Sequence, residues 1–277
     1  MITSFSNSRI KYIRDLMLRS RARKKEGRFV AEGVKMFLEA PAGDIVEAYV
    51  TERLYTRLRY EKELPEKYLK CREKLKEVPY EVVGDEIFAR ISDTVSPQGV
   101  ISIVQKKEYT LDEVLDSRKN ALYVVLENLQ DPGNLGTIMR TAEAAGVDSV
   151  ILGANCVDMY NPKVVRSTMG AIYRMPFTYV ENVREAIQVM REGGVKTYAA
   201  TLSETAKAYD EYDYHPATAF VIGNEGNGLT EEAITRSGSQ VYIPMEGEAE
   251  SLNASMAAGI LMYEAARQRR KPEIHRA

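Results

Sequence analysis

A run of six apolar residues at 121–126 constrains the fold of this chain most strongly. A strand with one face in water alternates polar and apolar residues, whereas an uninterrupted apolar strand is buried on both faces, as in parallel sheets. Short runs rich in apolar residues recur at 149–152, 197–200, 219–222 and 240–243, with helical patterns between them. We therefore predict that the second half forms an α/β domain with a doubly wound parallel sheet. In such a domain the ligand binds beyond the carboxyl ends of the strands.

The first half predicts a separate, smaller α/β domain, because 277 residues are long for a single core. Its strands are expected at 28–33, 45–50, 80–83 and 99–104, and its helices at 8–20 and 51–77. A polar stretch follows the last of these strands and is typical of a linker. We expect a first domain over 1–106, a linker over 107–119 and a second domain over 120–277.

Basic charge is concentrated at the start of the chain. Residues 1–30 hold nine Lys or Arg against two acids, although the whole chain carries a formal charge of −2. Such a segment is typical of an arm that contacts the phosphates of RNA or DNA, and a solvated helix face is the alternative. The residues expected to bind RNA there are Arg9, Arg21, Arg23, Lys24, Lys25 and Arg28.

Several classes of protein are excluded by what the sequence lacks. Two distant cysteines and two histidines supply neither a zinc cluster nor a disulfide scaffold, so no metal is expected. Neither the dinucleotide fingerprint nor a P-loop is present. The sequence has no membrane-spanning run and no signal-peptide core at its N-terminus, so we expect a cytoplasmic protein.

Glycines and small polar residues gather where the last two predicted strands end. The strand at 219–222 leads into Gly-Asn-Glu-Gly-Asn-Gly at 223–228, and Glu-Ser-Leu-Asn-Ala-Ser at 250–255 opens the last helix. Glycine lets a backbone approach a ligand closely. This arrangement predicts a binding site, although the same glycines also end strands, and Ser251 or Asn253 also suits a helix cap.

Three segments of the second half resemble the motifs of the SpoU family of RNA ribose 2′-O-methyltransferases, part of the SPOUT class. They are Asn134-x-Gly136-x-x-x-Arg140, Ile222-Gly-Asn-Glu-Gly-Asn-Gly-Leu229, and Ile243-Pro-Met245 followed by 250–258. The resemblance covers 121–268. It implies a trefoil-knotted domain, a homodimer and bound S-adenosylmethionine. The first half, through 29–33 and 92–100, resembles the ribosomal-protein-like RNA-binding domain often fused to such enzymes.

The resemblance also implies roles for individual residues. Arg140 is placed at the ribose hydroxyl, either as a base or, since a guanidinium stays protonated, as a clamp on the adjacent phosphate that Glu225 could orient. The expected catalytic group is Asn134, Arg140, Glu225, Ser251 and Asn253. The residues expected to bind the methyl donor are Thr201, Leu202, Gly223, Asn224, Ile243, Met245, Ser251, Leu252 and Asn253. Arg166 is expected as a further contact to RNA phosphate.

The sequence thus predicts an enzyme that uses S-adenosylmethionine to methylate a ribose 2′-hydroxyl in RNA. Ribosomal RNA of the 23S type is favoured over tRNA because of the fused first domain. A catalytically silent RNA-binding assembly factor is one alternative, and a nucleotide-dependent oxidoreductase, which would lack the dinucleotide fingerprint, is the other. Small residues along the last helix allow close packing, either on its own sheet or on a second subunit: Ala254, Ala257, Ala258, Leu261 and Ala265.

Overall fold

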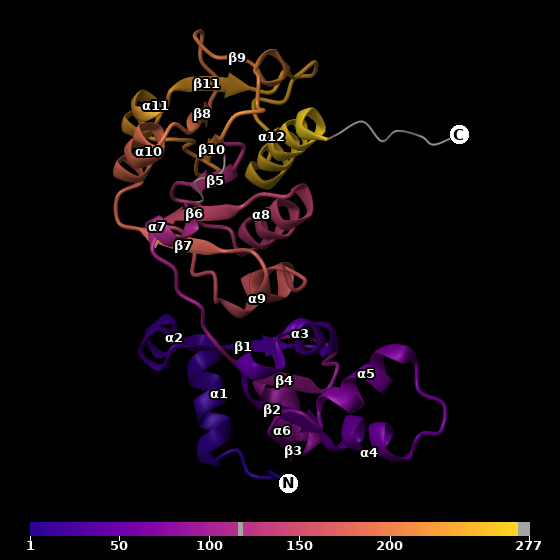
Figure 1. Ribbon diagram of the computed structural model, residues 1–277. Helices are drawn as coiled ribbons and strands as arrows, with labels where there is room; N and C mark the ends of the chain where they lie inside the picture. The colour runs from indigo at the N-terminus through magenta and orange to yellow at the C-terminus, as the bar shows by residue number, and fades with distance from the viewer. Residues whose placement is uncertain (116–118, 271–277) are drawn as a thin grey trace, which may run out of the picture. The chain divides into compact units, whose positions relative to one another are not determined.

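The computed structural model describes residues 1–115 and 119–270, which divide into two compact units (Figure 1). The first unit comprises Met1–Lys107 and Asp158–Tyr173, and the second comprises Glu108–Val157 and the residues from Arg174 onward. The segment Asp158–Tyr173 thus follows a strand of the second unit in sequence but packs in the first. The predicted domain boundaries stay a prediction, and part of the predicted linker, 116–118, lies outside the described residues.

A four-stranded sheet in the order β1-β4-β2-β3 forms the centre of the first unit. β1 and β2 both pair antiparallel with β4, while β3 runs parallel to β2 at the edge. The four expected strands are therefore present, within a residue or two of their predicted bounds. They are β1 (Arg28–Glu32), β2 (Ile45–Thr51), β3 (Tyr80–Val83) and β4 (Val100–Gln105).

Helices cover this sheet with apolar faces. Ile10, Ile13 and Leu16 of α1 are fully buried against the sheet, as their helical spacing predicts. The single helical stretch expected over 51–77 is two helices, because Pro65 has no backbone N–H and disfavours helix in the residue before it. The helices are α1 (Ser8–Leu18), α2 (Ser20–Glu26), α3 (Val34–Glu39), α4 (Glu52–Tyr60), α5 (Glu66–Lys74), α6 (Asp85–Ile91) and α9 (Pro162–Ser167).

The second unit contains a seven-stranded sheet in the order β7-β6-β5-β10-β8-β11-β9. Every pairing in it is parallel. All five residues of β5 are buried, which confirms the prediction from its apolar run. The strands are β5 (Leu122–Leu126), β6 (Ser149–Gly153), β7 (Phe177–Val180), β8 (Lys196–Ala200), β9 (Lys207–Ala208), β10 (Thr218–Ile222) and β11 (Ser239–Tyr242).

Helices lie on both faces of this sheet, as a doubly wound α/β domain requires. Figure 1 shows α10 and α11 on one side and α8 and α12 on the other, and each of these pairs packs together. The small residues of α12 face α8 and β10, so the stripe predicted on this helix packs within its own chain. The helices are α7 (Leu111–Val114), α8 (Pro132–Ala145), α10 (Val183–Glu192), α11 (Glu231–Arg236) and α12 (Ala254–Arg269).

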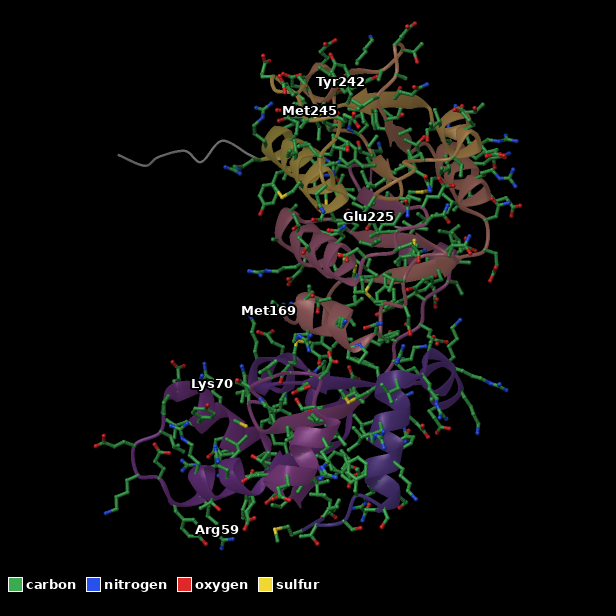
Figure 2. The ribbon with its side chains drawn as sticks, turned by 180° about the vertical axis from the view of Figure 1, so that it is seen from behind. Arg59, Lys70, Met169, Glu225, Tyr242 and Met245 are labelled. Carbon is green, nitrogen blue, oxygen red and sulfur yellow. The ribbon has the colours of Figure 1, made fainter. Side chains whose placement is uncertain are left out.

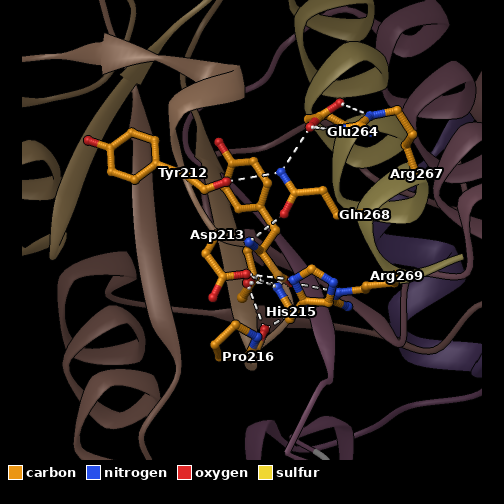
Figure 3. A network of polar contacts seen from close by, with 10 residues as sticks. Tyr212, Asp213, His215, Pro216, Glu264, Arg267, Gln268 and Arg269 are labelled. Atoms are coloured by element: carbon orange, nitrogen blue, oxygen red, sulfur yellow. Dashed lines mark hydrogen bonds and ion pairs between the residues drawn. The ribbon is translucent and has the colours of Figure 1, made fainter.

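A polar network fastens the last turn of α12 to the segment that leads into β10 (Figure 3). Arg269 donates from Nε to the carbonyl of Tyr214 at 2.8 Å and from Nη2 to the carbonyl of Pro216 at 2.8 Å. Gln268 exchanges two bonds with the same segment, donating to the Tyr212 carbonyl and accepting from the Tyr214 N–H, each at 2.9 Å. These bonds satisfy backbone groups outside the sheet and thereby fix the orientation of α12.

Within residues 1–115 and 119–270, no helix combines the length and the apolar character needed to cross a membrane. The trefoil knot stays a prediction.

Candidate active site

The carboxyl ends of β8, β10 and β11 border a cavity of about 450 Å³ in the second unit. Because these strands run parallel, the loops that follow them meet at one edge of the sheet. The volume falls within the range of roughly 300–1,000 Å³ that is typical of small-molecule sites. Eight of the nine residues expected to bind a methyl donor line the cavity: Thr201, Leu202, Gly223, Asn224, Ile243, Met245, Ser251 and Leu252.

The cavity has apolar walls and polar groups at its loops. Val241 and Leu261, which were not among the residues expected to bind the methyl donor, add to the wall formed by Ile243. Met245 and Glu225 come from the loops after β11 and β10 (Figure 2). Such a lining suits a flat apolar ring system whose edges are read by main-chain groups.

A chain of hydrogen bonds joins residues from the three motif segments. Glu225 Oε1 accepts from Asn134 Nδ2 at 2.9 Å, and Asn134 Oδ1 accepts from Asn253 Nδ2 at 3.0 Å. Asn253, the N-cap of α12, accepts from the Ser255 N–H at 2.9 Å. The structure thus brings together three of the residues predicted to be catalytic.

The groups at both ends determine the direction of these bonds. An ionised Glu225 carboxylate only accepts, so Asn134 presents its amide nitrogen to it. The free N–H groups at the start of α12 only donate, so Asn253 presents its oxygen to them. Asn253 Nδ2 therefore donates to Asn134 Oδ1, and each amide has a single orientation. Asparagine suits both positions because it carries one donor and one acceptor group side by side.

The surroundings of Glu225 favour its charged form. Partial burial alone would raise the pKa of this carboxyl, but hydrogen bonds from Asn134 and from the backbone N–H groups of Asp131 and Gln130 outweigh it and lower the pKa below its usual value. The carboxylate therefore stabilises the site at neutral pH, and this contribution is lost as the pH falls through the lowered pKa. Glu225 makes no ion pair with Arg140 among the described residues.

Replacing Glu225 by Gln is expected to slow methyl transfer by about tenfold at neutral pH. Glutamine keeps the shape but offers one acceptor oxygen, so its NH₂ group faces N–H donors and roughly 1–2 kcal/mol of hydrogen bonding is lost. The measurement is the rate at saturating methyl donor. Glu231→Gln is the control, because Glu231 lines the same cavity without these bonds. If both variants slow methyl transfer equally, only the charge at the cavity matters and not the hydrogen bonds of Glu225.

The loop after β10 closes on itself through its backbone. Asn224 and Gly228 exchange two hydrogen bonds of 2.9 and 3.0 Å. Asn224 Oδ1 also accepts from the N–H groups of Gly226 and Asn227, and its Nδ2 donates to the Asn128 carbonyl. The side chain of Asn224 thus builds the loop.

Arg140 and Ser251 are not part of the hydrogen-bonded chain formed by Glu225, Asn134 and Asn253. Arg140 lies on α8, exposed, and makes no hydrogen bond or ion pair with the described residues. Ser251 lines the cavity on the segment before α12. Among the described residues, no three or more His, Cys, Asp or Glu side chains are grouped to hold a metal ion.

Glu127 is a buried carboxylate that the sequence analysis missed. It follows β5 and accepts from the Thr230 N–H at 2.8 Å and from its hydroxyl at 2.9 Å. Thr230 caps α11, so Glu127 ties the far end of the glycine-rich loop to β5. The sequence does hold a signal for this role, because Glu127 directly follows a fully apolar strand. A carboxylate buried at such a position needs hydrogen-bond partners, since buried carboxylates are rare without them.

The residues predicted to bind RNA differ in their surroundings within the first unit. Arg23 is 4% exposed, binds Asp158 at 2.7 Å and donates to two carbonyls at the end of α1. Arg9 pairs with Glu81, and Arg166 pairs with Asp93 at 3.1 Å. Arg28 is half-buried and donates to the Tyr12 hydroxyl. Exposed side chains remain at Arg21, Lys24 and Lys25.

The fold and this cavity define an α/β protein with a cavity of small-molecule size at the carboxyl edge of a parallel sheet. Residues 121–263 match the SpoU rRNA methylase family, and residues 7–102 match the MRM3-like substrate binding domain. An uncharacterized tRNA/rRNA methyltransferase of Synechocystis is 33% identical over 96% of this chain and 93% of its own length. The chain belongs to the SpoU rRNA methylase family.

Two further relatives are similar to this chain. The 23S rRNA (guanosine(2553)-2′-O)-methyltransferase RlmP of Bacillus subtilis is 33% identical, over 66% of this chain and 70% of its own. The crystal structure of an AdoMet-bound rRNA methyltransferase from Sinorhizobium meliloti superposes with a TM-score of 0.81 at 29% identity, covering 96% of this chain and 97% of that one. The likeness to the Sinorhizobium structure extends over both units.

Proposed function

We propose that this protein transfers a methyl group from S-adenosylmethionine to a ribose 2′-hydroxyl in ribosomal RNA. The observation that carries the proposal is the cavity at the carboxyl edge of the sheet, whose lining residue Glu225 is hydrogen-bonded to Asn134 and, through it, to Asn253. RlmP, a relative of similar sequence, methylates a guanosine 2′-oxygen of 23S rRNA.

The residues of the cavity fit the methyl donor. S-adenosylmethionine supplies a sulfonium methyl group when bound. Ile243, Leu252 and Met245 provide apolar surface for its adenine, and the loops at Gly223 and Thr201 bring main-chain groups to the edges of that ring. Leu202 and Leu252 expose much of their side chains, which a bound ligand would cover.

Catalysis by these residues is largely a matter of position. In-line transfer of a methyl group requires alignment and exclusion of water more than covalent help from the protein. Asn134 and Asn253 hold the start of α8 and the start of α12 in a fixed relation, with Glu225 as the anchor. Arg140 acts as a clamp on a phosphate beside the target ribose, because its guanidinium stays protonated and its donors suit a phosphate.

Ribosomal RNA is the proposed substrate, with tRNA as the second candidate. The family and RlmP favour ribosomal RNA, and the Synechocystis relative carries both names. The exposed basic residues Arg21, Lys24 and Lys25 are proposed to contact phosphates, which supplies affinity without sequence information. A ribosomal substrate accords with the proposed cytoplasmic location.

A homodimer is proposed through the exposed side of α12. Met256 and Tyr263 are seven residues apart, so they lie on the same side of the helix, and they are 59% and 47% exposed. Ala258 and Ala265 are already buried within the chain. A second copy would cover the exposed side chains of Met256 and Tyr263, and the molar mass in solution tests this.

The test of the function is transfer of labelled methyl from S-adenosylmethionine to total RNA that lacks the modification. Alkali-resistant linkages are then mapped, because a methylated 2′-oxygen can no longer attack the adjacent phosphate. A resistant site in ribosomal RNA is the expected result, and one in tRNA would move the substrate to the second candidate. Donor binding without transfer to any RNA or ribosomal particle would favour the silent assembly factor, and absence of donor binding would refute the enzyme.

A further inference from the structure

The first unit carries a surface of tyrosines around one arginine, separate in sequence from the basic arm. This stacking face consists of Tyr55, Arg59 and Tyr60 of α4 with Tyr80 at the start of β3. The Arg59 guanidinium lies 6.0 Å from the ring centre of Tyr55 and 5.6 Å from that of Tyr60. Arg59 donates to the Tyr55 hydroxyl at 2.8 Å, and the rings of Tyr55 and Tyr80 are 6.3 Å apart. Figure 2 shows Arg59 on the outside of the first unit.

The stacking face is not required for the core of this unit. Leu54 and Leu58 are the buried residues of α4 and attach it to the sheet. Tyr60 is 68% and Tyr80 is 40% exposed, so each ring leaves much of its surface in water. Arg59 forms no ion pair with any described residue. Single exposed tyrosines are ordinary on a protein surface, but three of them around an arginine that lacks a carboxylate partner form an unusual surface.

The segment that carries Tyr55, Arg59 and Tyr60 of the stacking face is positively charged. Residues 52–77 contain nine Lys or Arg and six Asp or Glu, although the whole chain is slightly acidic. Three of these acids are held in ion pairs with residues three or four positions away: Glu61 with Arg57, Glu66 with Lys70 and Glu73 with Lys76. The surface therefore attracts a polyanion.

From this geometry we infer that the stacking face binds unpaired bases of the RNA substrate. Every base has a flat π face that stacks on tyrosine and on a guanidinium plane, while the positive charge attracts the backbone phosphates. Bases paired in a duplex do not expose these faces. The site is thus selective for single-stranded segments and tolerant of their sequence. The inference rests on the proposed function, because it names a subsite for the same substrate.

The test uses the full chain with a fluorescent single-stranded RNA of mixed sequence, about twelve nucleotides long, and the matching blunt duplex. Tyr60→Ala and Arg59→Ala are each expected to weaken binding of the single strand by about tenfold and to leave binding of the duplex within about twofold. Tyr60→Phe keeps the ring and should retain the affinity. Lys70→Ala is the control for charge, because it removes a cation from the same unit that already pairs with Glu66.

Two results would overturn the inference: unchanged affinity for the single strand in both alanine variants, or equal losses for single strand and duplex. The inference would also be overturned if the unaltered protein did not bind the single strand. Measuring methyl transfer separates failure of the stacking face from failure of the proposed function. The variants should raise the KM for RNA and leave kcat and donor binding unchanged. If the unaltered protein methylates RNA and the variants keep its KM, only the stacking face is refuted.

Discussion

Arg140→Ala is expected to slow methyl transfer by about 100-fold or more while leaving the affinity for S-adenosylmethionine within about twofold. Arg140 lies on α8, outside the lining of the donor cavity, and no described residue holds its guanidinium. Its five donors therefore remain available to RNA. Loss of a group that aligns the reacting atoms costs rate steeply, because displacement of about 1 Å is enough for a 100-fold effect.

The two possible roles of Arg140, a phosphate clamp or a base, lead to different predictions for its replacement. As a clamp, Arg140 contacts a phosphate, so its loss raises the KM for RNA and reduces the salt dependence of RNA binding by one phosphate contact. Lysine at this position keeps the charge but loses the bidentate fork, and an intermediate rate is expected. As a base, its replacement would change the pH profile and leave RNA affinity unchanged.

Arg184→Ala is the matched control for this experiment. Arg184 is an exposed arginine of the same unit, on α10, so its removal changes the net charge equally. It should leave both rate and donor binding unchanged. An Arg140→Ala variant with the rate of the unaltered enzyme would remove Arg140 from the mechanism.

The sequence predicted the elements whose burial leaves a plain pattern. The apolar run of β5 indicated a strand buried on both faces, and the spacing of Ile10, Ile13 and Leu16 indicated which side of α1 is buried. β7 and β9 were not predicted. They are strands of four and two residues at the two edges of the sheet, too short for a clear periodic signal to develop.

The site could be predicted as a set of residues but not as a geometry. The motifs indicated Asn134, Glu225 and Asn253, yet the bond between the first and the last joins positions 119 apart, and no local pattern shows it. Arg23 illustrates the same limit. Arg23 was grouped with the exposed basic residues, but its partner Asp158 lies 135 positions away in sequence. Asp158 and two backbone carbonyls accept the hydrogen bonds of the Arg23 guanidinium within the protein.

Gly223→Ala is expected to weaken S-adenosylmethionine binding by about 100-fold or more. A Cβ atom at this position would lie 2.2 Å from the carbonyl carbon of Gly228 and 2.4 Å from the nitrogen of Leu229, and both are backbone atoms. The loop has to open by more than 1 Å to accommodate it. That movement breaks the paired bonds between Asn224 and Gly228 and displaces the residues that border the cavity.

Gly226→Ala is the control, because it introduces the same methyl group into the same loop. There the added Cβ would lie 3.6 Å from Asn224 Oδ1, an ordinary contact. Calorimetric titration measures donor affinity, and circular dichroism shows whether the sheet remains folded. Affinity of Gly223→Ala within about threefold of the unaltered protein would contradict the prediction. If Gly223→Ala loses binding and Gly226→Ala keeps it, the contribution of this motif is the close approach of two backbone segments, which only the glycine at the end of β10 allows.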